Sequence, residues 1–150
     1  MQKGRSSGGS PKDGADKGRD GANRDVVALK VAMREGQDIL TPNGYAEVAK
    51  LLRTRLPEFG NRKAMADLDI RPFGEFWELR LKGGYVGKIN LRVYFADVPA
   101  RGEIVVLKAY KKEEGGRTSP YVMITLEDRL EDYLLGKLQV GAGVYRRATE

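Results

Sequence analysis

The sequence predicts an α+β fold, in which a small antiparallel sheet carries an N-terminal helix or helical hairpin on one face, followed by a C-terminal helix. Three consecutive segments, residues 76–82, 88–95 and 103–110, alternate apolar and polar side chains as half-buried strands do. Residues 41–56 and 120–138 repeat apolar side chains every three or four positions, as amphipathic helices do. The short connections between the three strands favour an antiparallel meander.

Composition limits the chemistry that this chain can perform. The 150 residues fit one domain with tails, and a hydrophobic content of 41% supplies one modest core. The chain has no cysteine and no histidine, which excludes disulfides, thiolate or imidazole metal sites, cysteine nucleophiles and serine–histidine triads. There is no apolar run of eighteen residues and no apolar N-terminal segment, so we expect neither a membrane span nor a secretory signal, and a cytoplasmic location.

Three regions follow from the distribution of apolar residues. Residues 1–24 are rich in Gly, Ser and charged side chains, which predicts a disordered basic tail. Residues 25–138 form the folded domain, and residues 139–150 form a C-terminal tail. Residues 25–37 alternate as a strand would but also contain good helix formers, and we favour a strand there.

The helix boundaries are better marked than those of residues 25–37. Thr41 and Pro42 open the first helix as a cap and a first-turn proline, and Pro57 with Gly60 ends it. Residues 61–68 allow a further helical turn. Ser119 and the proline that follows it open the C-terminal helix in the same way.

The strand pattern gathers cations and tyrosines on one face of the predicted sheet. The formal net charge is +6, and residues 76–112 hold eight Lys and Arg against three acidic side chains. Such a basic surface suggests a polyanionic partner, most commonly nucleic acid, although a solvated basic face is the alternative. The register decides whether Lys108 joins this face, because a slip of one residue would turn it to the other side. Residues expected on the face, or on the loop beside it, are Arg80, Lys82, Lys88, Arg92, Tyr94, Lys108, Tyr110, Lys111, Lys112 and Arg117.

Single-stranded RNA suits this surface, since arginine and lysine bind phosphates and tyrosine rings stack on unpaired bases. RNA cleavage is the sharper hypothesis, because the ribose 2′-hydroxyl supplies the nucleophile and no metal is required. A lysine crowded by cations would lose its proton more easily, so Lys82 or Lys108 would act as general base or acid. Tyr94 or Tyr110 would donate a proton. The candidate catalytic residues are Arg80, Lys82, Arg92, Lys108 and Tyr110. The candidate RNA-binding residues are Lys88, Tyr94, Lys111, Lys112 and Arg117.

Paired carboxylates occur at residues 113–114 and along residues 127–132. The second set lies on the predicted C-terminal helix and is typical of a solvated face. We therefore expect no metal site and no cofactor.

Several short fragments occur in an order typical of one protein family. They are LPEFG at 56–60, WELR at 77–80, LRVYF at 91–95, YKK at 110–112, TSP at 118–120 and RLEDY at 129–133. In this order, over residues 41–134, the chain resembles the toxins of bacterial type II toxin–antitoxin systems, in the phage-derived branch of the RelE/HigB-like superfamily.

The resemblance implies a RelE-like fold and a ribosome-dependent mRNA endonuclease that works without metal and leaves a cyclic phosphate. It implies neutralisation by a cognate antitoxin, often a helix-turn-helix protein. The related toxins often have histidine where Lys108 stands. Two alternatives stay open: a ParE-like gyrase-inhibiting toxin, and a noncatalytic nucleic-acid-binding or interaction protein from a phage or mobile element.

Overall fold

The computed structural model describes residues 23–141, and the predictions for residues 1–22 and 142–150 lie outside this part of the chain. Arg24, which the sequence placed at the end of a disordered tail, belongs to the folded domain. Its side chain is buried, and its Nε donates to Asp97 Oδ1 at 2.9 Å. No helix of the described region is long and apolar enough to cross a membrane.

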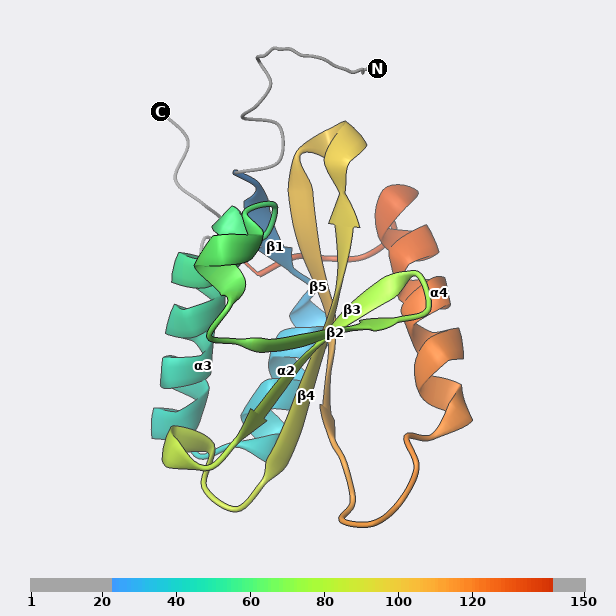
Figure 1. Cartoon of the computed structure of the whole chain (residues 1–150). Coiled ribbons are helices and arrows are strands. Elements are labelled where there is room, and N and C mark those ends of the chain that lie inside the picture. The colour runs from blue at the N-terminus through green and yellow to red at the C-terminus, as the bar shows by residue number, and fades with distance from the viewer. Residues whose placement is uncertain (1–22, 142–150) are drawn as a thin grey trace.

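Five strands form one mixed sheet in the order β1-β5-β4-β3-β2 (Figure 1). The strands are β1 (Asp25–Ala28), β2 (Asp69–Phe73), β3 (Phe76–Lys82), β4 (Asn90–Val98) and β5 (Glu103–Lys111). The α-helices are α2 (Lys30–Ile39), α3 (Pro42–Arg55) and α4 (Pro120–Leu134). The predicted α+β class is confirmed, and α2 with α3 forms the expected helical hairpin.

The sheet differs from the prediction at both edges. β1 pairs with β5 in parallel, so the sheet is mixed and not purely antiparallel. This pairing needs a long connection, which the whole segment from α2 to β4 provides. β2 was not predicted, because its charged residues and Pro72 lack the alternation of a half-buried strand. It is an edge strand paired only with β3, where a proline is tolerated.

Residues 25–37, for which we favoured a strand, divide into two elements. The strand ends at Ala28, and α2 begins at Lys30. Ala32 and Gly36, four residues apart, are the buried positions of this helix. A Cβ at Gly36 would lie 3.1 Å from the Tyr45 ring, so the small residue lets α2 pack closely against α3. Tertiary packing therefore decides between two conformations that the local sequence allows.

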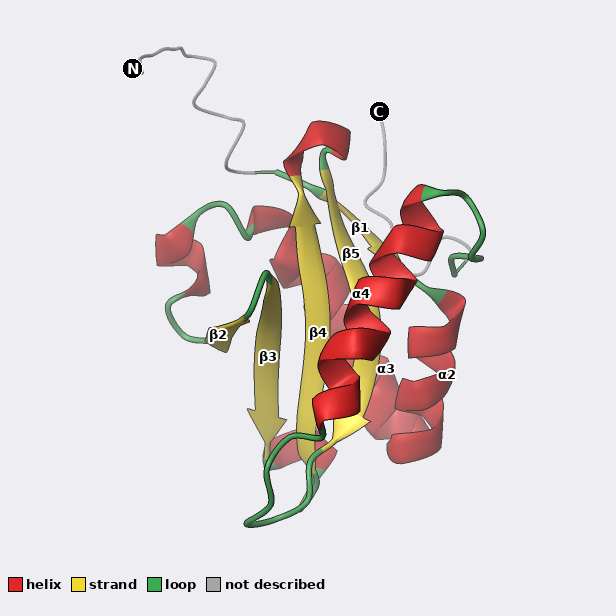
Figure 2. Ribbon diagram, turned by 90° about the vertical axis from the view of Figure 1, so that its right-hand side faces the viewer, coloured by secondary structure: helices red, strands yellow, loops and turns green. Residues whose placement is uncertain are grey.

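The sheet separates two helical layers. Figure 1 shows the sheet nearly edge-on, with α2 and α3 on one side and α4 on the other, and Figure 2 shows α4 in front of β4 and β5. Both helix starts are capped as the sequence predicts: Thr41 Oγ1 accepts from the Gly44 amide, and Ser119 Oγ accepts from the Tyr121 amide. α4 buries Val122 and Leu126 completely or nearly so.

A β-bulge interrupts the predicted alternation of β5. Tyr94 pairs with Lys108, whereas the next residue of β4, Phe95, pairs with Val106. Leu107 is therefore an extra residue, and the faces of β5 exchange at this point. Lys108 and the rest of the C-terminal half keep the predicted face, whereas Val106 turns to the side of α2 and α3.

The predicted C-terminal tail begins with ordered residues. Val140 forms an isolated antiparallel bridge with Leu29, and the Gly141 amide donates to the Ala28 carbonyl at 2.9 Å. Residues 139–141 therefore lie along the outer edge of β1, beyond the boundary that the sequence predicted for the folded domain.

A single buried hydroxyl offers a test of the packing between α3 and the sheet. The Tyr45 hydroxyl is buried without a hydrogen-bond partner within residues 23–141, beside a small cavity lined by Val48, Leu91 and other apolar side chains. We expect Tyr45→Phe to raise the free energy of unfolding by about 1 kcal/mol, because the variant no longer buries an unpaired polar group. Urea denaturation measures the change.

Tyr133→Phe is the matched control for this substitution. The Tyr133 hydroxyl donates to Glu103 Oε1 at 2.7 Å, so its removal should lower stability by about 1 kcal/mol. A loss of stability in Tyr45→Phe similar to that of the control would contradict the prediction.

Candidate nucleic-acid interface

Three rows of side chains cross the sheet face that lies on the side of α4. Cross-strand pairing places residues from β3, β4 and β5 in each row, and successive rows lie two residues apart along the strands. The predicted register is therefore correct for this part of the sheet. The first row is Glu78, Tyr94 and Lys108; the second is Arg80, Arg92 and Tyr110; the third is Lys82, Asn90 and Lys112.

A buried carboxylate organises the first two rows. Glu78 is 2% exposed, and its Oε1 accepts from Arg80 Nε at 2.7 Å. Its Oε2 accepts from the Tyr94 hydroxyl at 2.7 Å and lies 3.2 Å from an Arg92 terminal nitrogen. One carboxylate thus neutralises part of the charge of two arginines and holds them together on the face.

The surroundings of Glu78 favour its ionised form. Burial by itself would raise its pKa, but the hydrogen bonds from Arg80 and Tyr94 and the charges of both arginines lower the pKa below its ordinary value. Tyr94 shows the opposite shift. Burial, followed by the hydrogen bond to Glu78 and the charge of that carboxylate, raises the pKa of Tyr94, so its hydroxyl stays protonated.

Tyr94 is not available in the role that the sequence suggested. We expected its ring to stack on an unpaired base and its hydroxyl to donate a proton to RNA, but the residue is fully buried and its hydroxyl is bound to Glu78. Its ring lies 4.9 Å from that of Phe73. The sequence pattern places Tyr94 on the correct face, but its contacts with Phe73 of β2 and with Glu78 accompany complete burial.

Lys108 pairs with a carboxylate, whereas the sequence suggested that other cations surround it. Its Nζ donates to Glu35 Oε2 at 2.9 Å, and it also lies 5.9 Å from the centre of the Tyr110 ring. Arg129 of α4 binds the same carboxylate with two nitrogens, at 2.9 and 2.8 Å. Lys108 is therefore part of a structural ion-pair cluster.

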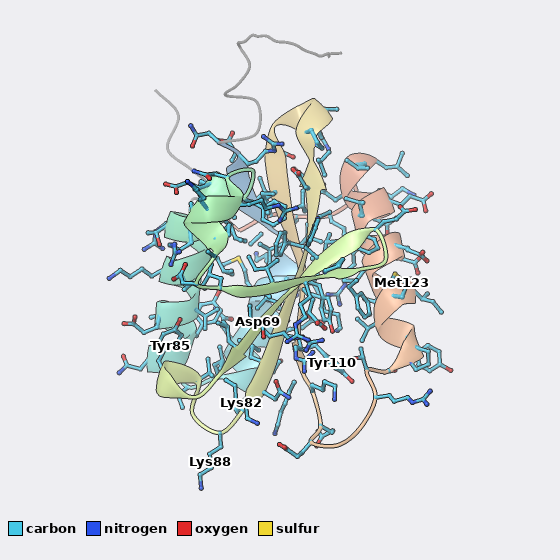
Figure 3. All side chains as sticks on the ribbon, viewed as in Figure 1. Asp69, Lys82, Tyr85, Lys88, Tyr110 and Met123 are labelled. Carbon is cyan, nitrogen blue, oxygen red and sulfur yellow. The ribbon has the colours of Figure 1, made fainter. Side chains whose placement is uncertain are left out.

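The third row and the adjoining loop form an exposed basic rim. Lys82, Lys88 and Tyr110 lie at the same end of the sheet, where the β3–β4 hairpin and the loop before α4 come together (Figure 3). The Lys82 side chain is 62% exposed and lies 3.9 Å from Glu114. Lys112 donates to the carbonyls of Glu113 and Gly116 and so holds the loop. Lys88 and Arg117 are exposed as well. Lys111 is also exposed, but it is the last residue of β5 and pairs with Leu91, whose side chain lines the cavity beside α2 and α3. Lys111 therefore lies on the other face of the sheet, contrary to the prediction.

Together with the exposed basic rim, the candidate residues form three groups. Arg92, Tyr94 and Lys108 are buried or mostly buried and paired inside the fold. Arg80 and Tyr110 are partly exposed and lie between this buried group and the basic rim. Within residues 23–141 the Tyr110 hydroxyl forms no hydrogen bond, which leaves it available to a ligand.

Sequence reasoning did not assign a role to the two carboxylates that organise this site. Glu78 was counted only as a charge opposing the cations, although its place between Trp77 and Leu79 on a strand did put it on the basic face. Glu35 lies on another element, 73 residues from Lys108, and no local pattern indicates the contact. Among residues 23–141, no group of three or more acidic side chains could hold a metal ion.

Comparison of the chain with protein-family models, with curated proteins and with solved structures finds no match. The geometry of this face and the resemblance of its sequence fragments are therefore the observations that bear on function.

Proposed function

We propose that this chain is the toxin of a type II toxin–antitoxin system and acts in the cytoplasm as a ribosome-dependent, metal-independent mRNA endonuclease. The observation that carries the proposal is the row formed by Arg80, Arg92 and Tyr110, which lies between the buried first row and the exposed basic rim. By the resemblance, Arg80 and Arg92 match the basic strand residues associated with phosphate binding, and Tyr110 matches the end of the last long strand. The α+β arrangement of helices on both sides of a small sheet also agrees with what the resemblance implies.

The geometry suits transesterification of the RNA backbone. The 2′-hydroxyl loses its proton to a water molecule, and its oxygen attacks the adjacent phosphorus. The bond from phosphorus to the 5′-oxygen breaks, the leaving oxygen takes up a proton, and a cyclic phosphate and a 5′-hydroxyl result. The hydrogen bond from Arg80 to Glu78 fixes the orientation of the Arg80 guanidinium, which would stabilise negative charge on the phosphate. Tyr110 has a hydroxyl available to donate a proton to the leaving oxygen. Lys82 and the other rim lysines bind the flanking phosphates.

A noncatalytic RNA-binding protein is the second candidate, and one observation favours it. Glu35 and Glu78 pair with Lys108 and the two arginines, which reduces the charge available for catalysis in the interior of the site. In this reading the exposed rim binds RNA without cutting it.

Expression in a bacterium, with mapping of mRNA 5′ ends, tests the proposal. We expect the wild-type chain to arrest growth and to generate new 5′-hydroxyl ends inside translated messages. Arg80→Ala should lower the cleavage rate about 10²- to 10³-fold, the usual effect of losing one group that stabilises transition-state charge. Lys50→Ala is the matched control, since this exposed lysine lies on α3, on the opposite side of the sheet.

The possible outcomes separate the candidates. Equal cutting by the wild type and Arg80→Ala would contradict the assignment of the site. Growth arrest without new cuts in mRNA would indicate that the target is gyrase or another protein. No arrest, with RNA bound by the purified protein, would establish the noncatalytic candidate. If the chain is such a toxin, its partner is an antitoxin that blocks this face or its access to the ribosome.

A further inference from the structure

Glu35 lies on α2, yet it contacts residues on the other side of the sheet. β1 pairs with β5 only as far as Val106, so among residues 23–141 no strand pairs with this edge of β5 beyond that point. Glu35 extends past this edge, and its Oε1 accepts from the Ala109 backbone amide at 3.1 Å. From α4, Arg129 donates to the Leu107 carbonyl at 2.9 Å. The ion pair between these two side chains satisfies backbone groups that β1 does not reach.

The same carboxylate also holds a cation of the candidate site. Glu35 Oε2 accepts from Lys108 Nζ at 2.9 Å, and this ammonium group lies 5.9 Å from the centre of the Tyr110 ring. The side chains of Glu35 and Lys108 are 22% and 16% exposed, so solvent screens the pair only in part. Without the carboxylate, the lysine side chain has several rotamers and no fixed position beside Tyr110.

The charge state of Glu35 suits the binding of two cations. Burial would raise its pKa, but the hydrogen bonds and charges of Arg129 and Lys108 lower the pKa below its ordinary value. The carboxylate is therefore ionised at neutral pH and binds both cations at once.

We propose that Glu35 is a positioning residue of the candidate site: it holds the Lys108 ammonium group beside Tyr110 and joins that strand edge to α4. The inference deepens the proposed function and rests on it for the catalytic consequence. It assigns Lys108 the role of a fixed positive charge next to the proton donor, in place of the general acid or base that the sequence suggested.

A double-mutant cycle tests this assignment with two readouts. In the purified protein without RNA, the ¹³C–¹H signals of the Tyr110 ring report the position of Lys108. We expect Glu35→Gln and Lys108→Met each to shift these signals, and the double variant to shift them no further. Tyr121, which is 73% exposed on α4, provides the control signal and should not move.

The cleavage assay supplies the second readout of the same cycle. We expect Glu35→Gln to lose up to about a hundredfold in cleavage rate, an effect of the size produced by a misplaced group near the chemistry, but to lose nothing more in the Lys108→Met background. A purely structural role through Arg129 would give the same loss in both backgrounds and would overturn the proposal.

The two readouts also separate this proposal from the proposed function. If the wild type does not cleave RNA while the Tyr110 signals couple Glu35 to Lys108 as described, the nuclease function fails and the positioning contact stands. If Glu35→Gln leaves the Tyr110 signals unchanged in a folded protein, the positioning role is wrong whether or not RNA is cut.

Discussion

Glu78→Ala is expected to lower the free energy of unfolding by about 3–5 kcal/mol, the usual cost of removing one partner from a buried ion pair. The substitution leaves Arg92, which is 7% exposed, and the fully buried Tyr94 hydroxyl without their shared acceptor. Glu78→Gln should have a smaller effect, because its amide oxygen still accepts a hydrogen bond. Chemical denaturation measures both changes, and Glu75→Ala in the exposed turn before β3 should change stability by less than about 0.5 kcal/mol.

Acid titration gives an independent measurement of the same carboxylate. The folded-state pKa of Glu78 lies below its ordinary value of 4.5, so its stabilising contribution is complete above that pH and is lost as the pH falls through the lowered pKa. The difference in stability between the wild type and Glu78→Gln should therefore shrink below about pH 4.5. A difference that stays constant through this range would show that the ionised form of Glu78 is not what stabilises the network.

Phe95→Ala is expected to lower stability by about 3–5 kcal/mol, as large-to-small substitutions of buried aromatic residues do. Phe95 is fully buried beside the bulge, and its ring packs edge-to-face on Phe59 at 5.1 Å. Phe59 in turn packs on Trp77 at 5.1 Å, and Arg62 lies over both of these rings. The loss of one ring therefore leaves a cavity and weakens the attachment of the connector after α3.

The exposed Tyr121 provides the aromatic control for this substitution. Tyr121→Ala removes a ring that is 73% exposed on α4, and it should change stability by less than about 0.5 kcal/mol. If Phe95→Ala were as mild as this control in denaturation experiments, the aromatic cluster would not be the main anchor between the sheet and the segment after α3.

Much of the fold could be predicted from the sequence because the signals are local. The alternation in β3 and β4 identifies which side chains share a face, since the period of a strand is two wherever the strand lies. Thr41 and Ser119 mark the helix starts through contacts two or three residues away. The parallel pairing of β1 and the existence of β2 were missed, because edge positions depend on partners distant in the chain.

The candidate site was predicted in its location but not in its electrostatics. Arg80, Arg92 and Tyr110 do lie side by side, as the register required. No pattern in the sequence indicated the bulge at Leu107. Lys108 nevertheless lies on the face that the sequence predicted. The burial of Tyr94 involves Phe73 of β2, an edge strand that the sequence did not predict.

The sequence by itself determined the α+β class, the absence of histidine and cysteine chemistry, and the gathering of cations and tyrosines on one face of three strands. These properties follow from composition and from short-range periodicity. Only the tertiary structure decided which of the cations are neutralised and which are exposed. Glu35 and Glu78 neutralise the interior of the face while the rim at Lys82 stays open, because charges interact through distance and burial in space and not through spacing along the chain.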